Sequence, residues 1–179
     1  MTREQVYKRI DGEREYHDRK WPGHGHHVAA YLTYMHYYLQ AMISSATLCE
    51  ECELGYIQGA RGGMRKFASL AVACMEENGI SYRNGQVTRV FNGVRLERAS
   101  VYAAIDAERE CQESGSGGRF TALRRAHEFG ELLTMLRHYM RLADAAWSGI
   151  PGSDAALDVV RKLAAIAVRA MELYGAPER

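Results

Sequence analysis

The sequence has 179 residues, of which 47% are hydrophobic and 25% charged, and its formal net charge is +1. This composition is typical of a globular protein, and the near-zero charge argues against partners such as duplex nucleic acid or an anionic membrane. No apolar run approaches the roughly 20 residues that cross a bilayer, and the N-terminus is too polar for a secretory signal. We therefore expect a cytoplasmic protein with its cysteines reduced.

Three helices are predicted in the first half of the chain, over residues 3–17, 26–46 and 60–78. These segments lack proline and are rich in residues that favour helix. Gly79 follows the last periodic residue and suits a left-handed C-cap.

The segment 80–98 follows and contains two turn signals, Asn84-Gly85 and Asn92-Gly93. The stretch between them, QVTRVF, has the composition of a strand. A small hairpin and a flexible arm are both compatible with this pattern.

Three further helices are predicted in the second half, over residues 99–113, 123–148 and 153–174. In the middle one, apolar residues from Phe129 to Trp147 recur at spacings of three and four, which places them on one helix face. Gly175 then suits a C-cap, as Gly79 does in the first half.

The two halves repeat each other. VYKRIDGERE (6–15) and VYAAIDAERE (101–110) share seven of ten positions, and RKFASLAVACMEENG (65–79) and RKLAAIAVRAMELYG (161–175) share eight of fifteen. Matches in the same order and spacing are harder to obtain by chance than a shared composition. Three such helices cover their apolar faces poorly alone, whereas two copies can cover each other.

We therefore predict an all-α fold, a tandem repeat of two three-helix units packed as a pseudo-two-fold helical bundle. Repeat 1 covers residues 1–79, a linker covers 80–98, and repeat 2 covers 99–179. One chain would thus form the pseudo-dimer that a homodimer makes from two. Further self-association is left open.

Residues 10–21, IDGEREYHDRKW, resemble the N-terminal signature of small helical proteins of phages and prophages. His17 stands where that signature has glutamine. The matching positions are Glu13, Arg14, Asp18, Lys20 and Trp21. Those proteins resemble the all-α, MazG-like nucleoside triphosphate pyrophosphohydrolases, and the resemblance covers both repeats.

In the MazG-like group, acids on the second and third helices hold Mg²⁺, which binds the triphosphate. Repeat 1 has His27 and Ala30 at two of these positions, whereas repeat 2 keeps Glu128 and Glu131. The resemblance therefore implies Glu128 and Glu131 as catalytic residues, and Asp158 as the weakest of three Mg²⁺ ligands. The implied substrate contacts are His127, Tyr139, Arg161 and Lys162. The alternative is that Glu128 and Glu131 are solvated acids complementing a helix dipole.

Two functions follow as expectations. The first is a MazG-like nucleotide-binding protein, a degenerate Mg²⁺-dependent nucleoside triphosphate pyrophosphohydrolase. The second is a non-catalytic phage accessory protein that sequesters a nucleotide or small phosphate ligand, or inhibits a host protein. The acids missing from repeat 1 favour the second function.

Histidines and cysteines form two further clusters, His24, His26 and His27 in GHGHH, and Cys49 and Cys52 in a CxxC pattern. Histidine and cysteine are residue types that can bind transition metals. The predicted helix between them separates the clusters by roughly 30 Å, so a shared zinc site is disfavoured. A polar helix start is the favoured interpretation of the histidines.

Tyrosines and cations mark the second and third helices of repeat 1. Tyr34, Tyr37 and Tyr38 share one face, which indicates half-buried packing or a pocket that stacks a base. Basic residues at the third helices are expected to pair with acids of the first helices, with phosphate contact as the alternative. The cations are Arg61, Arg65, Lys66, Arg161 and Lys162, and the acids are Asp11, Glu15, Asp106 and Glu110.

Overall fold

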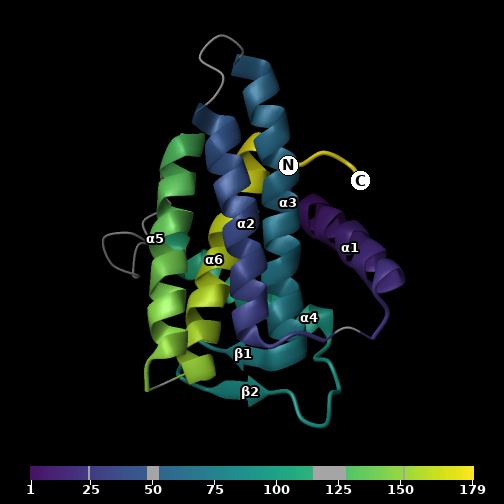
Figure 1. The fold of residues 1–179 in the computed structure, drawn as a ribbon, viewed down its shortest axis with the longest axis vertical. Coiled ribbons are helices and arrows are strands. Elements are labelled where there is room, and N and C mark those ends of the chain that lie inside the picture. Colours follow the sequence, from purple (N-terminus) through teal and green to yellow (C-terminus); the bar gives the residue numbers. More distant parts are fainter. Residues whose placement is uncertain (24, 48–52, 115–127, 151) are drawn as a thin grey trace.

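A computed structural model of the protein describes the chain except residues 24, 48–52, 115–127 and 151, with the backbone alone for 47 and 53–58 (Figure 1). The described helices are α1 (Arg3–Lys20), α2 (Val28–Thr47), α3 (Glu53–Asn78), α4 (Arg98–Ser114), α5 (Phe129–Ser148) and α6 (Gly152–Tyr174). A two-stranded antiparallel hairpin, β1 (Gly79–Ser81) and β2 (Val87–Arg89), lies between α3 and α4. The predicted all-α class is confirmed, with this hairpin as the only sheet in the described part.

Of the two structures that the sequence left open for the linker, a hairpin and a flexible arm, the structure shows the hairpin. Its strands flank Asn84-Gly85, and the Gly85 N–H donates to the Tyr82 carbonyl at 3.0 Å. The second signal forms a separate turn after β2, where Asn92 and Gly93 both have positive φ. Asn and Gly accept this backbone conformation at the lowest cost, which explains why both turns were visible in the sequence.

Helices α2, α3, α5 and α6 run along the long axis of the molecule, and α1 lies obliquely beside α3 (Figure 1). The central pair is α3 and α6, with α2 packed on α3, α5 packed on α6, and α2 in contact with α5. The central pair is rich in alanine, and Ala68, Ala71, Ala164 and Ala167 are fully or almost fully buried. Small side chains let backbones approach closely, so these two helices can occupy the middle of the core.

Helices α1 and α4 meet through two stacked tyrosines, each of which donates a hydrogen bond to an aspartate of the opposite helix. The rings of Tyr7 and Tyr102 stack with their centroids 4.0 Å apart. The Tyr7 hydroxyl donates to Asp106 at 2.6 Å, and the Tyr102 hydroxyl donates to Asp11 at 2.7 Å. Each helix therefore supplies the acceptor for the other, which fixes both the distance and the register between them.

Buried ion pairs attach α1 and α4 to the central helices. Glu76 of α3 accepts from Arg14 at 2.8 Å and from Arg98 at 2.5 Å. A matching set on α6 joins Glu172 to Arg109 at 3.0 Å and to Arg3 at 2.9 Å. Each carboxylate thus binds one arginine from each half of the chain, so these pairs bind the halves together.

A second pair of buried carboxylates binds two of the five third-helix cations, which confirms the predicted pairing with first-helix acids only in part. Arg65 donates to Glu13 at 3.0 Å, and Arg161 donates to Glu108 at 3.2 Å. The acids are Glu13 and Glu108 instead of the expected Asp11, Glu15, Asp106 and Glu110. Asp11 and Asp106 are taken by the tyrosines, and Glu15 and Glu110 are exposed.

We expect Glu108→Ala to lower the free energy of unfolding by about 3–5 kcal/mol, because Arg161 would lose a fully buried carboxylate partner. Glu110→Ala is the matched control on the same helix; its side chain is exposed, so its effect should stay within about 0.5 kcal/mol. Urea unfolding measures both values. Equal unfolding midpoints for the two variants would contradict a structural role for the Glu108–Arg161 pair.

Candidate functional site

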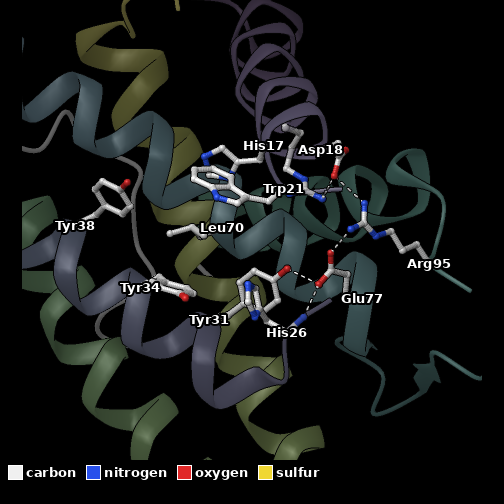
Figure 2. Close-up of a pocket in the computed structure, with 11 residues that line it drawn as sticks. His17, Asp18, Trp21, His26, Tyr31, Tyr34, Tyr38, Leu70, Glu77 and Arg95 are labelled. Carbon is white, nitrogen blue, oxygen red and sulfur yellow. Dashed lines mark hydrogen bonds and ion pairs between the residues drawn. The ribbon is translucent and has the colours of Figure 1, made fainter. Parts of the chain in front are cut away.

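A cavity of about 410 Å³ lies between the end of α1, α2, the C-terminal part of α3 and the linker (Figure 2). Its volume is within the range of small-molecule pockets, about 300–1,000 Å³. It is lined by Arg14, His17, Asp18, Trp21, His26, Tyr31, Tyr34, Tyr38, Leu70, Glu77 and Arg95. All of these residues belong to the first half of the chain or to the linker that follows it.

Aromatic rings form the walls of the cavity. Tyr31, Tyr34 and Tyr38 follow one face of α2, and Trp21 comes from the end of α1 (Figure 2). Leu70 of α3 lies between these two sides in the view. Trp21 and Tyr34 are each 45% exposed, so part of each side chain remains accessible to a ligand.

The end of α1 determines where Trp21 lies. The backbone N–H of Trp21 donates to the His17 carbonyl at 2.9 Å and forms the last hydrogen bond of the helix. Pro22 follows and cannot continue the hydrogen-bond pattern, and Gly23 then turns the chain with φ of 75°. The His17 ring supports the indole from the helix side, with an edge-on contact at 5.2 Å between ring centroids.

Charged groups at one end of the cavity are paired with one another. Arg95 of the linker bridges Asp18 at 2.8 Å and Glu77 at 2.6 Å. Glu77 also accepts from the His26 backbone N–H at 3.0 Å and from the Tyr31 hydroxyl. Figure 2 shows these contacts as one chain of dashed lines. Both carboxylates therefore have an ion-pair partner within the protein.

The pKa values at this end follow from burial and from these contacts. Burial and the hydrogen bond to Glu77 raise the pKa of Tyr31, so its hydroxyl stays protonated as a donor. Burial alone would raise the pKa of Asp18, but the hydrogen bond from Arg95 and the nearby arginines outweigh it and lower that pKa. Asp18 is therefore ionised at neutral pH.

The acids that the sequence assigned to catalysis lie elsewhere. Glu128 is the N-cap of α5, and its backbone N–H donates to Glu131 at 3.2 Å, which corresponds to the helix-start alternative. Both acids lie near Tyr174, at the C-terminal end of α6. Asp158 is sixteen residues earlier on α6, about 24 Å away along the helix. The structure does not bring the three predicted Mg²⁺ ligands together.

Of the predicted substrate contacts, Tyr139, Arg161 and Lys162 lie near Asp158 and are engaged within the protein. Asp158 accepts from Arg161 and from Lys162, each at 2.7 Å, and Arg161 is also bound to Glu108. Tyr139 is buried, and burial followed by the nearby Glu108 and Asp158 raises its pKa. His127 lies outside the described residues. Across the described residues, no group of three or more His, Cys, Asp or Glu side chains could hold a metal ion.

Part of the observed cavity was visible in the sequence. Tyr34 and Tyr38, proposed as base-stacking residues, line it, whereas Tyr37 is 68% exposed and does not. His26 lines the cavity and His27 is exposed, whereas His24, Cys49 and Cys52, the other members of the histidine and cysteine clusters, lie outside the described residues.

The sequence interpretation missed Glu77 and Arg95 as site residues. Glu77 follows Glu76 in the chain, but the two carboxylates have different surroundings and different partners. Arg95 belongs to a linker without periodicity, so only the fold reveals that it reaches the cavity. Trp21 was noted only as part of the family signature.

Comparison of the chain with protein-family models, with curated proteins and with solved structures finds no match. Of the helices in the described part, none combines the length and apolar character that a membrane span requires. The proposed function is therefore inferred from the cavity and its surroundings.

Glu13 contacts His17 of the cavity lining, and its ionisation makes the stability of the fold depend on pH. Burial would raise its pKa, but His17, Arg65 and Arg179 together lower it to about 2. Ionised Glu13 therefore stabilises the fold fully above about pH 4.5, and this contribution disappears as the pH falls toward about 2. We expect Glu13→Gln to be less stable than the parent at pH 7 and to lose less stability between pH 4.5 and 2.

The measurement is the free energy of unfolding as a function of pH. Glu15→Gln is the control, since Glu15 is an exposed carboxylate on the same helix, and this variant should keep the pH profile of the parent. Identical slopes for Glu13→Gln and the parent in that range would contradict the assigned pKa.

Proposed function

We propose that the protein is a non-catalytic nucleotide-binding protein that holds the base of its ligand in the aromatic cavity. The observation that carries this proposal is the accessible space between Trp21 and the tyrosines of α2. Every nucleobase has flat π faces, and stacking on aromatic side chains is worth about 1–3 kcal/mol per base. A planar heterocycle is the chemistry that suits such walls.

The charges of the cavity support an uncharged base as the occupant. Asp18 and Glu77 share Arg95 as an ion-pair partner, and Arg14 is paired with Glu76. Each of these charged groups therefore already has a partner of opposite sign within the protein. The hydroxyl groups of Tyr34 and Tyr38 and the imidazole of His26 are polar groups on the lining that can hydrogen-bond a base edge.

The resemblance to MazG-like enzymes supports an alternative, a Mg²⁺-dependent nucleoside triphosphate pyrophosphohydrolase that uses Glu128 and Glu131. In favour of it, both acids are exposed at the start of α5 and lie within one helical turn. Against it, Asp158 is remote and bound to Arg161 and Lys162. Within the non-catalytic proposal, a phage accessory role fits best: the protein sequesters a nucleotide in the host cytoplasm.

We also propose that the chain arose by tandem duplication and that its halves are related by a pseudo-two-fold axis. Reciprocal contacts support this proposal: the Tyr7–Asp106 and Tyr102–Asp11 bonds exchange equivalent residues of the repeat. The arginine sets on Glu76 and Glu172 do the same. In a crystal structure, residues 3–81 should superpose on 98–177 by a rotation close to two-fold; halves that do not superpose would overturn the proposal.

Base binding is testable through Trp21, because the chain has two tryptophans and Trp147→Phe leaves Trp21 as the only one. We expect nucleoside 5′-monophosphates to quench its fluorescence, since a stacked base contacts the indole. In this background Tyr34→Ala should weaken binding about tenfold or more, through the loss of one stacking ring.

Tyr37→Ala is the matched control, because Tyr37 lies on the same helix but does not line the cavity. Its dissociation constants should equal those of the parent. No quenching by adenine, guanine, cytosine or uracil nucleotides, or an equal effect of the two tyrosine variants, would overturn the assignment of the cavity.

Catalysis is tested by incubating the protein with nucleoside and deoxynucleoside triphosphates and Mg²⁺, and measuring monophosphate and pyrophosphate. We expect no release of either product above the background of a no-protein control. Product that disappears in both Glu128→Ala and Glu131→Ala would establish the hydrolase alternative instead. Product that persists undiminished in both variants would show catalysis at another site.

A further inference from the structure

We propose that the ligand is a nucleoside phosphate whose phosphate group binds Lys20 and Lys66 at the rim of the aromatic cavity, without a metal ion. This inference rests on the proposed base site and specifies the ligand class of that site. It differs from the MazG-like expectation in two respects, since it places the phosphate in the first half of the chain and needs no Mg²⁺.

Two lysines sit on aromatic residues that line the cavity. The Lys20 ammonium is 4.7 Å from the ring centroid of Trp21, and the Lys66 ammonium is 5.4 Å from that of Tyr38. In the described part of the chain, neither lysine has a carboxylate partner. Cation–π contacts hold the ammonium groups near the cavity without neutralising them. Both charges thus stay available for an anion.

The surroundings of these lysines add positive charge. Arg179 lies over the ring of Tyr16, with its Cζ 3.0 Å from the centroid, and the Lys20 ammonium is 5.4 Å from the same centroid. Glu13 is the acid at this position, and it already binds Arg65 and Arg179. Glu13 therefore already faces two arginines, and the two lysines add positive charges for which the described residues supply no carboxylate partner.

This arrangement separates two kinds of chemistry. The charged groups at the inner end of the cavity are paired with one another, which suits an uncharged base, whereas Lys20 and Lys66 at the rim have no carboxylate partner among the described residues and suit an anion. Lysine binds phosphate as a mobile point charge, so it does not require the fixed geometry that arginine pairs impose. A molecule with a flat heterocycle at one end and a phosphate at the other satisfies both regions.

The two carboxylates that line the cavity are already paired with an arginine, which disfavours them as metal ligands. Mg²⁺ binds oxygen ligands such as carboxylates. Asp18 and Glu77, the two acids that line the cavity, are both bound by Arg95. Coordination of a metal by either acid would leave the Arg95 guanidinium without that partner, so the lysines are the groups that compensate phosphate charge.

The experiment titrates the Trp147→Phe protein with adenosine, its 5′-monophosphate and its 5′-triphosphate in the presence of EDTA, following Trp21 fluorescence; the guanine, cytosine and uracil sets repeat it. We expect at least one monophosphate to bind about tenfold or more tighter than its nucleoside. Lys20→Gln and Lys66→Gln should each weaken monophosphate binding about fivefold or more and leave nucleoside binding unchanged. Lys8→Gln, an exposed lysine on α1 that does not line the cavity, is the control and should change neither affinity.

The outcomes separate this inference from the base site. Equal affinities for nucleoside and monophosphate, unchanged monophosphate binding in both lysine variants, or monophosphate binding only when Mg²⁺ replaces EDTA would overturn the phosphate site and leave base stacking intact. Failure of all nucleosides and nucleotides to bind would overturn both proposals. A nucleotide affinity that falls with added salt while nucleoside affinity stays constant would support the phosphate site.

Discussion

The arrangement of the helices depends on buried charge pairs that connect α1 and α4 to the central helices. An isolated buried charge is costly, so each buried arginine and carboxylate must keep its partners as the chain folds. Glu76 and Glu172 each accept arginines from both halves of the chain, and therefore α1 cannot shift on α3 without leaving an arginine unpaired. These contacts fix the position of the C-terminal end of α1 relative to α3, and Trp21 directly follows that end.

The cavity lies in the first half because a few polar residues there have apolar counterparts in the second. Glu77 corresponds to Leu173 in the repeat, and Tyr31 corresponds to Leu132. The Tyr31–Glu77 hydrogen bond, which closes the polar end of the cavity, thus has no equivalent at these positions. Arg95 adds a contact from the linker, which follows only the first half. The same helical framework therefore supports a polar, aromatic cavity on one side without requiring it on the other.

Sequence reasoning succeeded where the signal was local and repeated. Helical periodicity predicted the six helices, and Asn84-Gly85 marked a turn that the sequence left open between a hairpin and a flexible arm, because each pattern depends on neighbours in the chain. The sequence could not place the acids relative to one another: Glu128 and Glu131 were assigned as Mg²⁺ ligands with Asp158, yet a motif on one helix does not show which end of the next helix it meets. The bridge from Arg95 to Asp18 and Glu77 joins three distant segments, and no local pattern could have predicted it.

Under the proposed duplication, the distribution of shared and divergent residues has a physical explanation. A buried arginine or glutamate is difficult to replace alone, because the remaining partner would be left charged and desolvated. The pairs Glu13–Arg65 and Glu108–Arg161 are accordingly the same in both halves. Positions at the rim of the cavity are partly exposed, and a substitution there costs little stability. New ligand chemistry would therefore arise at the rim and at the linker, while the buried pairs kept the framework unchanged, which is the pattern that Arg95 follows.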